Sequence, residues 1–340
     1  MTPVDDLHAL LVCPACRGAL AWSQAEGRCA SCGRAYPVLD GIPVMLVERS
    51  AAEHDEIEHL HGHQHKHQQA AFFDRELAEE FEITRPHGTP ALYRWLLVEK
   101  FRRSMTGLEA AVPGATALAV CAGSGMDAEL LARAGARVIA ADISLGAARR
   151  ARERARRHGL AIVPLVADVE GLPFADGSLD LVYVHDGLHH LEEPTRGLQE
   201  MARVAGRAVS VTEPARAAAT ALAVRLGLAL EQEDAGNRVA RLTPAEVADA
   251  LRARGFEIVH AERYAMYYRH EPGRAFRLLS RPWLLPAVTA AWRAANAAIG
   301  RAGNKLTVSA VRAAAPRAAS ACVPARPTAA GKEPTAARER

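Results

Sequence analysis

The pattern of apolar and polar positions along the chain changes at Gly114. After Gly114, short apolar runs alternate with amphipathic helical stretches. Strands are expected at Ala117–Cys121, Arg137–Ala141, Ala161–Ala167, Leu179–His185, Ala208–Thr212, Phe256–His260 and Leu306–Val311. Helices are expected between them, including Pro194–Val204 and one with Thr243 as N-cap and Pro244 as its first residue. This alternation implies a parallel sheet with helices on both faces, and we predict an α/β fold with a Rossmann-like doubly wound seven-stranded sheet.

The segment before this sheet predicts a helical lid. Between Ala70 and Met105 apolar residues recur at helical spacing, with a break at Arg85-Pro86-His87-Gly88. Residues 49–69 are polar and histidine-rich, with little apolar periodicity, which favours a linker. Three of these histidines, His59, His63 and His67, would share one face of a helix. No carboxylate or cysteine stands at a fixed ligand spacing from them, so we favour a solvated linker over a second metal site.

The predicted domain spans residues 70–313, and two segments near the C-terminus, one inside this domain and one after it, differ from the strand–helix pattern. The apolar stretch Pro282–Trp292 is short and is flanked by Arg281 and Arg293, which favours a core or lid helix over a membrane-surface helix. Residues 314–340 are mostly Ala, Pro, Arg and Thr, so we expect a disordered tail.

Composition narrows the class of protein. Of 340 residues 49% are hydrophobic, and the formal net charge is only +3, which argues against a broad nucleic-acid surface but not against a local basic patch. No apolar run is long enough to insert stably into a membrane, and Asp5 and Asp6 stand where a secretion signal would be basic. These features predict a cytoplasmic protein; they do not indicate its oligomeric state.

Four of the six cysteines form two C-x-x-C pairs near the N-terminus, Cys13/Cys16 and Cys29/Cys32. Two such pairs can bring four thiolates to one tetrahedral Zn²⁺, and a site filled by protein ligands is structural rather than catalytic. Residues 1–48 are too few to form a large core, so zinc would supply much of their folding energy. Together with Tyr36-Pro-Val-Leu-Asp-Gly-Ile-Pro-Val-Met-Leu46, these cysteines resemble the Trm112-like zinc-ribbon family, which implies an association with methyltransferases.

A glycine turn and two acidic residues follow successive predicted strands. Gly123-Ser124-Gly125 follows the first strand, Asp142 ends the second, and Asp168 follows the third. Glycines allow close approach to a ligand, and a carboxylate at the second strand end suits the ribose of an adenosine ligand. The turn also fits a dinucleotide fingerprint, but Asp127 at the helix start would repel a pyrophosphate. With Asp142, Asp168 and Asp186 it would attract S-adenosylmethionine, which carries a sulfonium and an ammonium group.

The same motifs, with Ala167-Asp-Val-Glu-Gly-Leu-Pro-Phe-Ala-Asp-Gly-Ser-Leu-Asp-Leu-Val-Tyr183, resemble class I S-adenosylmethionine-dependent methyltransferases of the type 11 group over about residues 92–312. The resemblance implies a cofactor site formed by nine residues. They are Gly123, Ser124, Gly125, Asp127, Asp142, Ile143, Asp168, Val169 and His185. Gly123 and Gly125 would approach the methionine moiety, Asp142 the ribose and Asp168 the adenine. The chain departs from the family at Ala119 and Cys121, where an acidic residue and a glycine are common, and Asp127 would then anchor the ammonium.

The fourth strand runs into His185-Asp186-Gly187-Leu188-His189-His190, which places titratable groups beside the expected methyl group. His185 or His189 is a candidate general base, and a mere lining role is the alternative. A small-molecule or natural-product acceptor suits the modest net charge. An rRNA or tRNA base is the alternative suggested by the zinc ribbon. An inactive binding scaffold and, more distantly, a nicotinamide-dependent oxidoreductase complete the hypotheses.

Overall fold

The computed structural model describes residues 3–47, 57–75, 78–191, 193–217, 225, 239–267 and 271–313. The predicted disordered tail, residues 314–340, lies outside this part of the chain. Among the described residues no helix combines the length and the apolar character that crossing a membrane requires.

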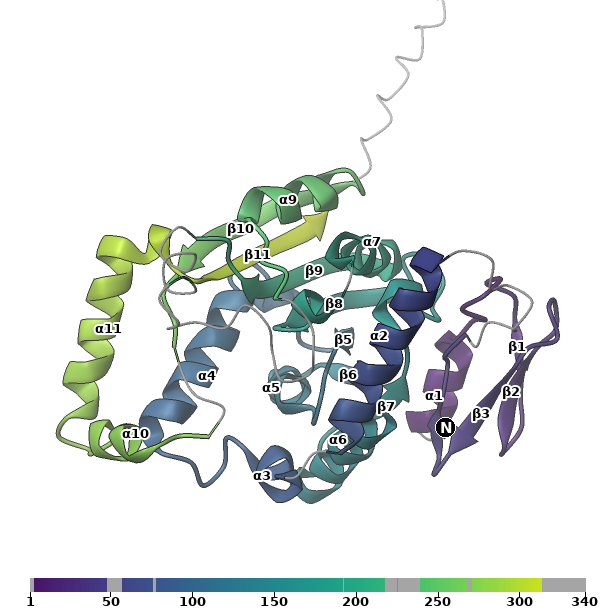
Figure 1. The fold of residues 1–340 in the computed structure, drawn as a ribbon, viewed down its shortest axis with the longest axis horizontal. Helices are drawn as coiled ribbons and strands as arrows, with labels where there is room; N and C mark the ends of the chain where they lie inside the picture. Colours follow the sequence, from purple (N-terminus) through teal and green to yellow (C-terminus); the bar gives the residue numbers. More distant parts are fainter. Residues whose placement is uncertain are drawn as a thin grey trace, which may run out of the picture.

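Seven strands form one mixed sheet (Figure 1), in the order β10-β11-β9-β8-β5-β6-β7. They are β5 (Thr116–Val120), β6 (Arg137–Asp142), β7 (Ile162–Val166), β8 (Leu179–His185), β9 (Ala205–Pro214), β10 (Phe256–Tyr264) and β11 (Lys305–Arg312). The seven-stranded, Rossmann-like fold is confirmed, and the parallel arrangement implied by the alternation holds for β5 to β9 but not for β11, which is antiparallel to both β9 and β10. Lys305 pairs with Tyr264, so the chain re-enters the sheet at the end where β10 stops and must run in the opposite direction.

Helices cover both faces of this sheet. On one face α5 (Met126–Arg133), α6 (Leu145–His158) and the end of α4 (Ala91–Ser104) share a buried cluster with the strands. On the other face α7 (Pro194–Val204) and α9 (Pro244–Arg252) complete a larger cluster. β5 alternates between the two clusters, as a strand buried on both sides must. α7 has its predicted bounds, and Thr243 caps α9 through a capping box with Glu246.

The N-terminal unit is a small antiparallel ribbon joined to the edge of the large sheet. It consists of α1 (Pro3–Leu10), β1 (Leu20–Trp22), β2 (Glu26–Cys29), β3 (Ala35–Leu39) and β4 (Ile42–Pro43). Val44 forms a parallel bridge with Val166 of β7, and the backbone N–H of Met45 donates to the Val166 carbonyl at 2.8 Å. Leu7, Leu11, Tyr36 and Met45 belong to the same buried cluster as α7 and α9. The ribbon therefore shares a core with the larger domain.

The predicted linker at residues 49–69 is largely wrong. α2 spans Ile57–Asp74 and is followed by α3 (Glu79–Thr84) and α4, with the break after α3 at the predicted position. Contacts with the sheet domain explain the helix, because His65 bonds the His190 carbonyl at 2.8 Å and Lys66 forms an ion pair with Asp168 at 2.6 Å. Because these contacts are polar and join residues far apart in the chain, they produce no apolar periodicity in the sequence of α2 that could have predicted the helix. The side chains of His59 and His63 lie outside the described part of the chain, so the histidine metal site stays untested.

The connection from β10 to β11 forms an arm on the side opposite the ribbon, built from α10 (Arg274–Leu279) and α11 (Leu285–Ile299) (Figure 1). Leu285, Val288 and Trp292 of α11 pack against a small cluster that includes Leu92 and Leu96 of α4. Only Thr289 of α11 is fully buried. The prediction of a core or lid helix at Pro282–Trp292 therefore describes only one face of α11.

Candidate functional site

A cavity of about 450 Å³ opens at the carboxyl ends of the central parallel strands. A cleft at this edge of a doubly wound sheet is the usual ligand site of such folds. Nearly all of the predicted site residues line it: Gly123, Ser124, Asp127, Asp142, Ile143, Asp168, Val169, His185 and His189. Side chains from α2, α3 and α4 complete the walls, so the lid helices and the strand ends enclose one site.

The two predicted glycines have different roles. Gly123 has φ +52°, and a Cβ added there would meet nothing within 4 Å, so the turn leaves open space toward the cavity. Gly125 does not line the cavity. Its φ is +78°, and an added Cβ would lie 3.1 Å from Cβ of Ala151 on α6. Gly125 therefore allows α5 to begin close against α6, while Gly123 leaves room for a ligand.

Asp142 organises the glycine turn. Its Oδ2 accepts a 2.8 Å hydrogen bond from the Gly123 N–H, and its Oδ1 accepts one of 3.0 Å from the Ser144 N–H. Burial raises the pKa of Asp142 above its usual value, although these backbone donors oppose the effect. Each carboxylate oxygen has a second acceptor position, so the same group can bind the turn and a ribose hydroxyl.

At the end of β7 an ion-pair cluster joins the lid to the sheet. Asp168 accepts a 2.9 Å hydrogen bond from the Glu170 N–H through Oδ1, while its Oδ2 meets Lys66 of α2. Lys66 also forms an ion pair with the carboxylate of Glu170. Burial acts to lower the pKa of Lys66, but the attraction of Asp168 and Glu170 outweighs it and raises the pKa. Lys66 thus closes α2 over the predicted adenine end of the cavity.

Asp127 is the centre of a second group of polar side chains. Its carboxylate lies 3.3 Å from Nδ1 of His185 and 3.3 Å from the hydroxyl of Tyr183. Nζ of Lys100, from α4, lies 3.9 Å away and is buried. Burial lowers the pKa of Lys100, and the negative charge of Asp127 only partly opposes this. The zwitterionic end of an amino acid would find both an anion and a cation here.

The next strand end carries a third pair. Asp186 forms an ion pair with Lys305 of β11, and Nε2 of His185 lies 3.3 Å from its Oδ2. Burial favours the neutral form of Asp186, but the charges of Lys305 and Lys100 hold its pKa below the usual value. Asp186 has φ +52°, so the backbone turns sharply where β8 leaves the sheet.

Glu213 holds the loop that carries the second predicted histidine. This carboxylate is fully buried and accepts backbone N–H groups of Gly187 at 2.9 Å and of Leu188 at 2.7 Å through Oε1. Its Oε2 lies 2.8 Å from Nδ1 of His189. A carboxylate at Nδ1 favours the tautomer with the proton on that nitrogen and leaves Nε2 as the basic atom. The sequence analysis missed Glu213, although it stands at a strand end like Asp142 and the same rule applies.

The acidic character predicted for the cavity is only part of its charge. Lys66, Arg85, Lys100, Arg150 and Lys305 line it as well, and three of them face the predicted aspartates directly. Three of these cations come from helices, Arg85 from the turn after α3 and Lys305 from the last strand, all outside the glycine turn. The charge argument against a dinucleotide is therefore weaker than expected. The prediction of an S-adenosylmethionine site depends more on the sheet topology and on the glycine turn.

The two family departures are accommodated locally. Ala119 is buried in the sheet and contributes to the cluster under α5 and α6. Cys121 has φ +50°, a region that favours glycine, and burial raises the pKa of its thiol well above the usual value. Its Cβ fills the space beside Gly187, where an added Cβ would lie only 2.4 Å away. A glycine at position 187 thus makes room for the side chain at position 121.

A buried arginine joins the glycine turn to the lid. Nε of Arg154 on α6 donates to the Ser124 carbonyl at 2.9 Å, and its NH1 donates to the Arg85 carbonyl at 2.7 Å. Its partner is Glu129 of α5, at 2.8 Å, and both side chains are almost inaccessible to solvent. His87 also contacts Glu129, at 2.6 Å. The glycine turn and the segment after α3 are therefore both held by the Arg154–Glu129 ion pair.

The four predicted zinc ligands converge in the N-terminal ribbon. Sγ of Cys13 lies 3.7 Å from Sγ of Cys32, Sγ of Cys16 lies 3.5 Å from Sγ of Cys29, and all four sulfurs lie within 4.8 Å of one another. Tetrahedral Zn²⁺ with Zn–S distances of ~2.3 Å separates its sulfurs by roughly 3.8 Å. The arrangement fits a single closed zinc site.

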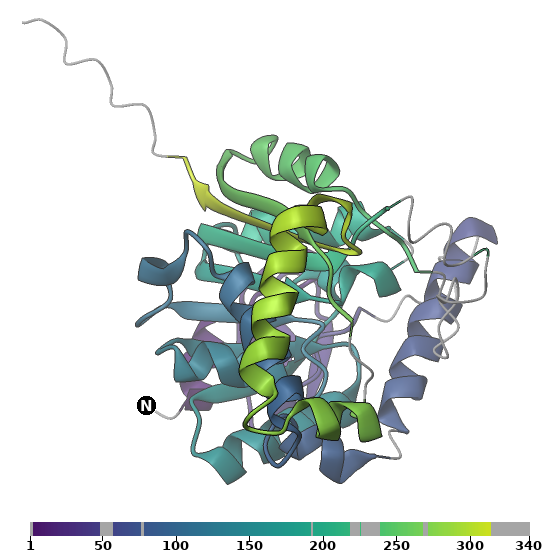
Figure 2. The ribbon, with the colours of Figure 1, turned by 90° about the vertical axis from the view of Figure 1, so that its left-hand side faces the viewer.

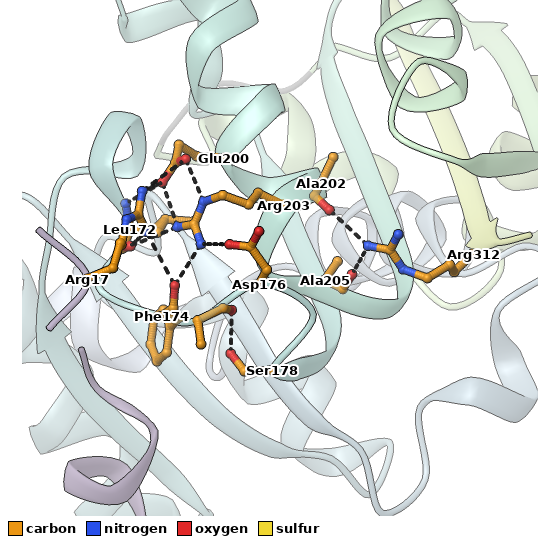
Figure 3. A network of polar contacts seen from close by, with 11 residues as sticks. Arg17, Leu172, Phe174, Asp176, Ser178, Glu200, Ala202, Arg203, Ala205 and Arg312 are labelled. Atoms are coloured by element: carbon orange, nitrogen blue, oxygen red, sulfur yellow. Dashed lines mark hydrogen bonds and ion pairs between the residues drawn. The ribbon is translucent and has the colours of Figure 1, made fainter. Parts of the chain in front are cut away.

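The knuckle that holds Cys13 and Cys16 also contacts the large domain (Figure 3). Arg17 has φ +62° and donates to the carbonyl oxygens of Leu172 at 2.8 Å and Phe174 at 3.3 Å. It also forms an ion pair with Glu200 of α7 at 3.1 Å. In the figure Arg17 and Arg203 approach these acceptors from opposite sides. The segment after Asp168 and Val169 is therefore fastened to the cysteine cluster.

Two family models match the chain, a methyltransferase domain at residues 118–208 and a Trm112p-like protein at residues 5–41. A demethylmenaquinone methyltransferase from Renibacterium salmoninarum is 36% identical over 135 residues, which are 40% of this chain and 53% of that protein. One from Corynebacterium urealyticum is 43% identical over 93 residues, 27% of this chain and 37% of that protein. The chain spans about half or less of the length of these relatives.

Among solved structures, a magnesium protoporphyrin IX methyltransferase from Synechocystis PCC 6803 with bound SAH is similar to this chain. The TM-score is 0.50 at 17% identity, over 73% of this chain and all of that one. At this identity the likeness shows the fold alone, and it confirms the predicted methyltransferase fold. Residues 118–208 of the chain thus match the methyltransferase-domain family, and a match to Trm112p-like proteins at residues 5–41 precedes them.

Proposed function

We propose that the chain is an S-adenosylmethionine-dependent methyltransferase that acts on a small-molecule acceptor. The observation that carries this proposal is the single cavity in which the Gly123 turn, Asp142 and the Asp168 strand end meet. The bound cofactor would supply an electrophilic methyl group. Asp142 would hold the ribose, Asp168 and Val169 the adenine, and Asp127 and Lys100 the ammonium and carboxylate of the methionine moiety.

The acceptor end of the cavity has both apolar and basic side chains. Phe73 of α2 and Leu191 line it beside His189 and His190, and the rings of Phe73 and His190 meet edge to face at 5.6 Å. A flat, largely apolar acceptor fits such walls. His189, oriented by Glu213, would remove a proton from the acceptor, and His185 would line the methionine end. The named activity of the relatives supports a quinol-like acceptor, and an RNA base remains the alternative.

We further propose that Cys13, Cys16, Cys29 and Cys32 bind one structural Zn²⁺. With four thiolates around it the ion would take no part in methyl transfer. Its effect on the site would be indirect, through Arg17 and the segment it holds beside Val169. The cytoplasmic location stays a prediction.

Calorimetric titration of the full chain with S-adenosylmethionine, and separately with NAD, tests the cofactor. Asp142→Asn should weaken S-adenosylmethionine binding by roughly 1–3 kcal/mol, because a charge-assisted acceptor is lost. Asp249→Asn is the matched control, since that carboxylate lies on α9 with its side chain 73% exposed. Binding of NAD in preference would refute the assignment. Binding without transfer to a demethylated quinol or to tRNA would favour an inactive scaffold.

A further inference from the structure

In the part of the chain that the structure describes, the arm formed by α10 and α11 leaves an apolar surface exposed. While Leu285, Val288 and Trp292 pack inward, the opposite face of α11 is a row of exposed alanines: Ala287, Ala290, Ala291, Ala294, Ala297 and Ala298. Figure 2 looks onto this side of the molecule, and the yellow-green ribbon of α11 lies at its front. A helix exposed in this way normally carries polar residues on its outer face, so the alanine face calls for a partner.

Large apolar side chains are also exposed at both ends of α11. Trp283 is 70% exposed just before the helix, and Ile299 is 63% exposed at its last residue. Leu278, on α10, is 51% exposed. At ~1.5 Å per residue the helix between Trp283 and Ile299 is roughly 20 Å long. Ile299 follows Trp292 by about two helical turns, so it lies on the side of α11 that packs inward, whereas the alanines lie on the opposite side.

The charge of the arm has a single sign. Between Pro272 and Asn304 the sequence contains five arginines and no aspartate, glutamate or lysine. They are Arg274, Arg277, Arg281, Arg293 and Arg301. Arg281 precedes α11, close in sequence to Trp283, and Arg301 follows it, close to Ile299, so each end of the helix carries an exposed positive charge. The whole chain carries a net charge of only +3, so this arm is locally basic on a nearly neutral protein.

We propose that the α10–α11 arm binds the surface of an anionic lipid bilayer, with α11 lying parallel to it. A helix that lies in the bilayer interface combines an apolar face with arginines at its margins, and tryptophan favours that depth. A second copy of the chain is a poorer partner, because two such arms would bring like charges together. A nucleic acid would satisfy the arginines but would leave the alanine strip, Trp283 and Ile299 exposed to water.

Attachment through this arm would place α11 at the bilayer while α4 connects it to the cavity. Trp292 of α11 lies under the guanidinium of Arg103 at 5.1 Å, and Trp95 of α4 lies under that of Arg293 at 5.4 Å, so α11 is fixed to α4. α4 in turn supplies Lys100 to the cavity. The bilayer contact and the cavity therefore share one rigid helix, while the ribbon lies on the far side (Figure 1). The inference concerns binding alone and does not depend on the proposed methyl transfer.

Vesicle flotation of the full chain tests the proposal, with phosphatidylcholine vesicles alone and with added phosphatidylglycerol. We expect binding to the anionic vesicles that falls with added salt, and little binding to the neutral ones. At ~1 kcal/mol for each arginine, Arg281→Ala with Arg301→Ala should weaken binding about thirtyfold. Arg156→Ala with Arg252→Ala is the matched control, because it removes the same charge from exposed sites on α6 and α9.

A second measurement places the helix itself at the bilayer. Brominated acyl chains should quench part of the tryptophan fluorescence of the wild-type chain, and Trp283→Phe should abolish that part. Equal binding to neutral and anionic vesicles, no binding at all, or an equal loss in the control variant would overturn the proposal. So would self-association in sedimentation velocity that Trp283→Ala removes, since the occupant would then be a second copy.

Discussion

Replacing Glu129 by glutamine tests whether one buried ion pair supports both the fold and the glycine turn at Gly123-Ser124-Gly125. Burial acts to raise the pKa of Glu129, but hydrogen bonds from Arg154, Arg133 and His87 outweigh it and lower the pKa from 4.5 to about 2. That difference corresponds to roughly 3 kcal/mol of stability. Breaking a buried ion pair from one side costs a similar amount, ~3–5 kcal/mol, because the remaining charge loses its partner.

The pH dependence follows from the direction of this change. A carboxyl group with a lowered pKa in the folded state contributes its full stability above pH ~4.5, where it is ionised in both states, and loses it as the pH falls toward 2. Chemical denaturation at pH 7 should show Glu129→Gln to be less stable than wild type by ~3 kcal/mol. The gap should shrink by about 1 kcal/mol at pH 3.5.

Glu153→Gln is the control for this experiment. The pKa of Glu153 is also lowered to about 2, by hydrogen bonds from Arg156 and Arg157, but this cluster lies on the surface of α6. Solvent screens it, so the substitution should leave the free energy of unfolding nearly unchanged. Glu129→Gln should also weaken binding of S-adenosylmethionine, because Arg154 holds the Ser124 carbonyl. Equal effects of the two substitutions on stability would refute the reasoning.

Three further predictions concern the zinc cluster, the lid and the histidine. Removing zinc with a chelator, or replacing Cys16 by serine, should lower the thermal midpoint of the whole chain in calorimetry; a large-domain transition that does not move would contradict the shared core. Lys66→Ala should speed dissociation of S-adenosylmethionine up to about tenfold in stopped flow, because α2 loses its ion pairs with Asp168 and Glu170; an unchanged rate would argue against a lid role. Glu213→Gln should shift His189 toward the Nε2-protonated tautomer in nitrogen NMR spectra and slow methyl transfer at least tenfold, with cofactor affinity unchanged; an unaltered tautomer would refute its positioning role.

The sequence was sufficient for the parts of the site that are local. Gly123, Asp142 and Asp168 each follow a strand whose apolar run is plain, and the ends of parallel strands meet at one edge of the sheet. The cysteine spacing likewise specified the cluster. The sequence predicted the class of sheet but not the direction of every strand, because the reversed direction of β11 depends on the path of the α10–α11 connection before it.

The remaining parts of the site depend on long-range contacts. Lys66 lies in a polar segment without periodicity, and its role comes from ion pairs with Asp168 and Glu170, about a hundred positions later. Lys100 stands on an amphipathic helix where a solvated lysine is the usual expectation, yet it is buried. The exposure of the alanine face of α11 could not be predicted either, because alanine is common in both buried and exposed helices and so does not indicate which face is buried.

The bridge between Val44 and Val166 has a consequence for solubility. β7 is the last strand of the large sheet on that side, and a terminal strand with unpaired backbone groups invites pairing with another molecule. The ribbon occupies this position together with Met45, whose N–H donates to the Val166 carbonyl. Removal of the first 47 residues would therefore uncover both a strand edge and the apolar surface beneath it, and the shortened protein would tend to aggregate rather than persist as a monomer.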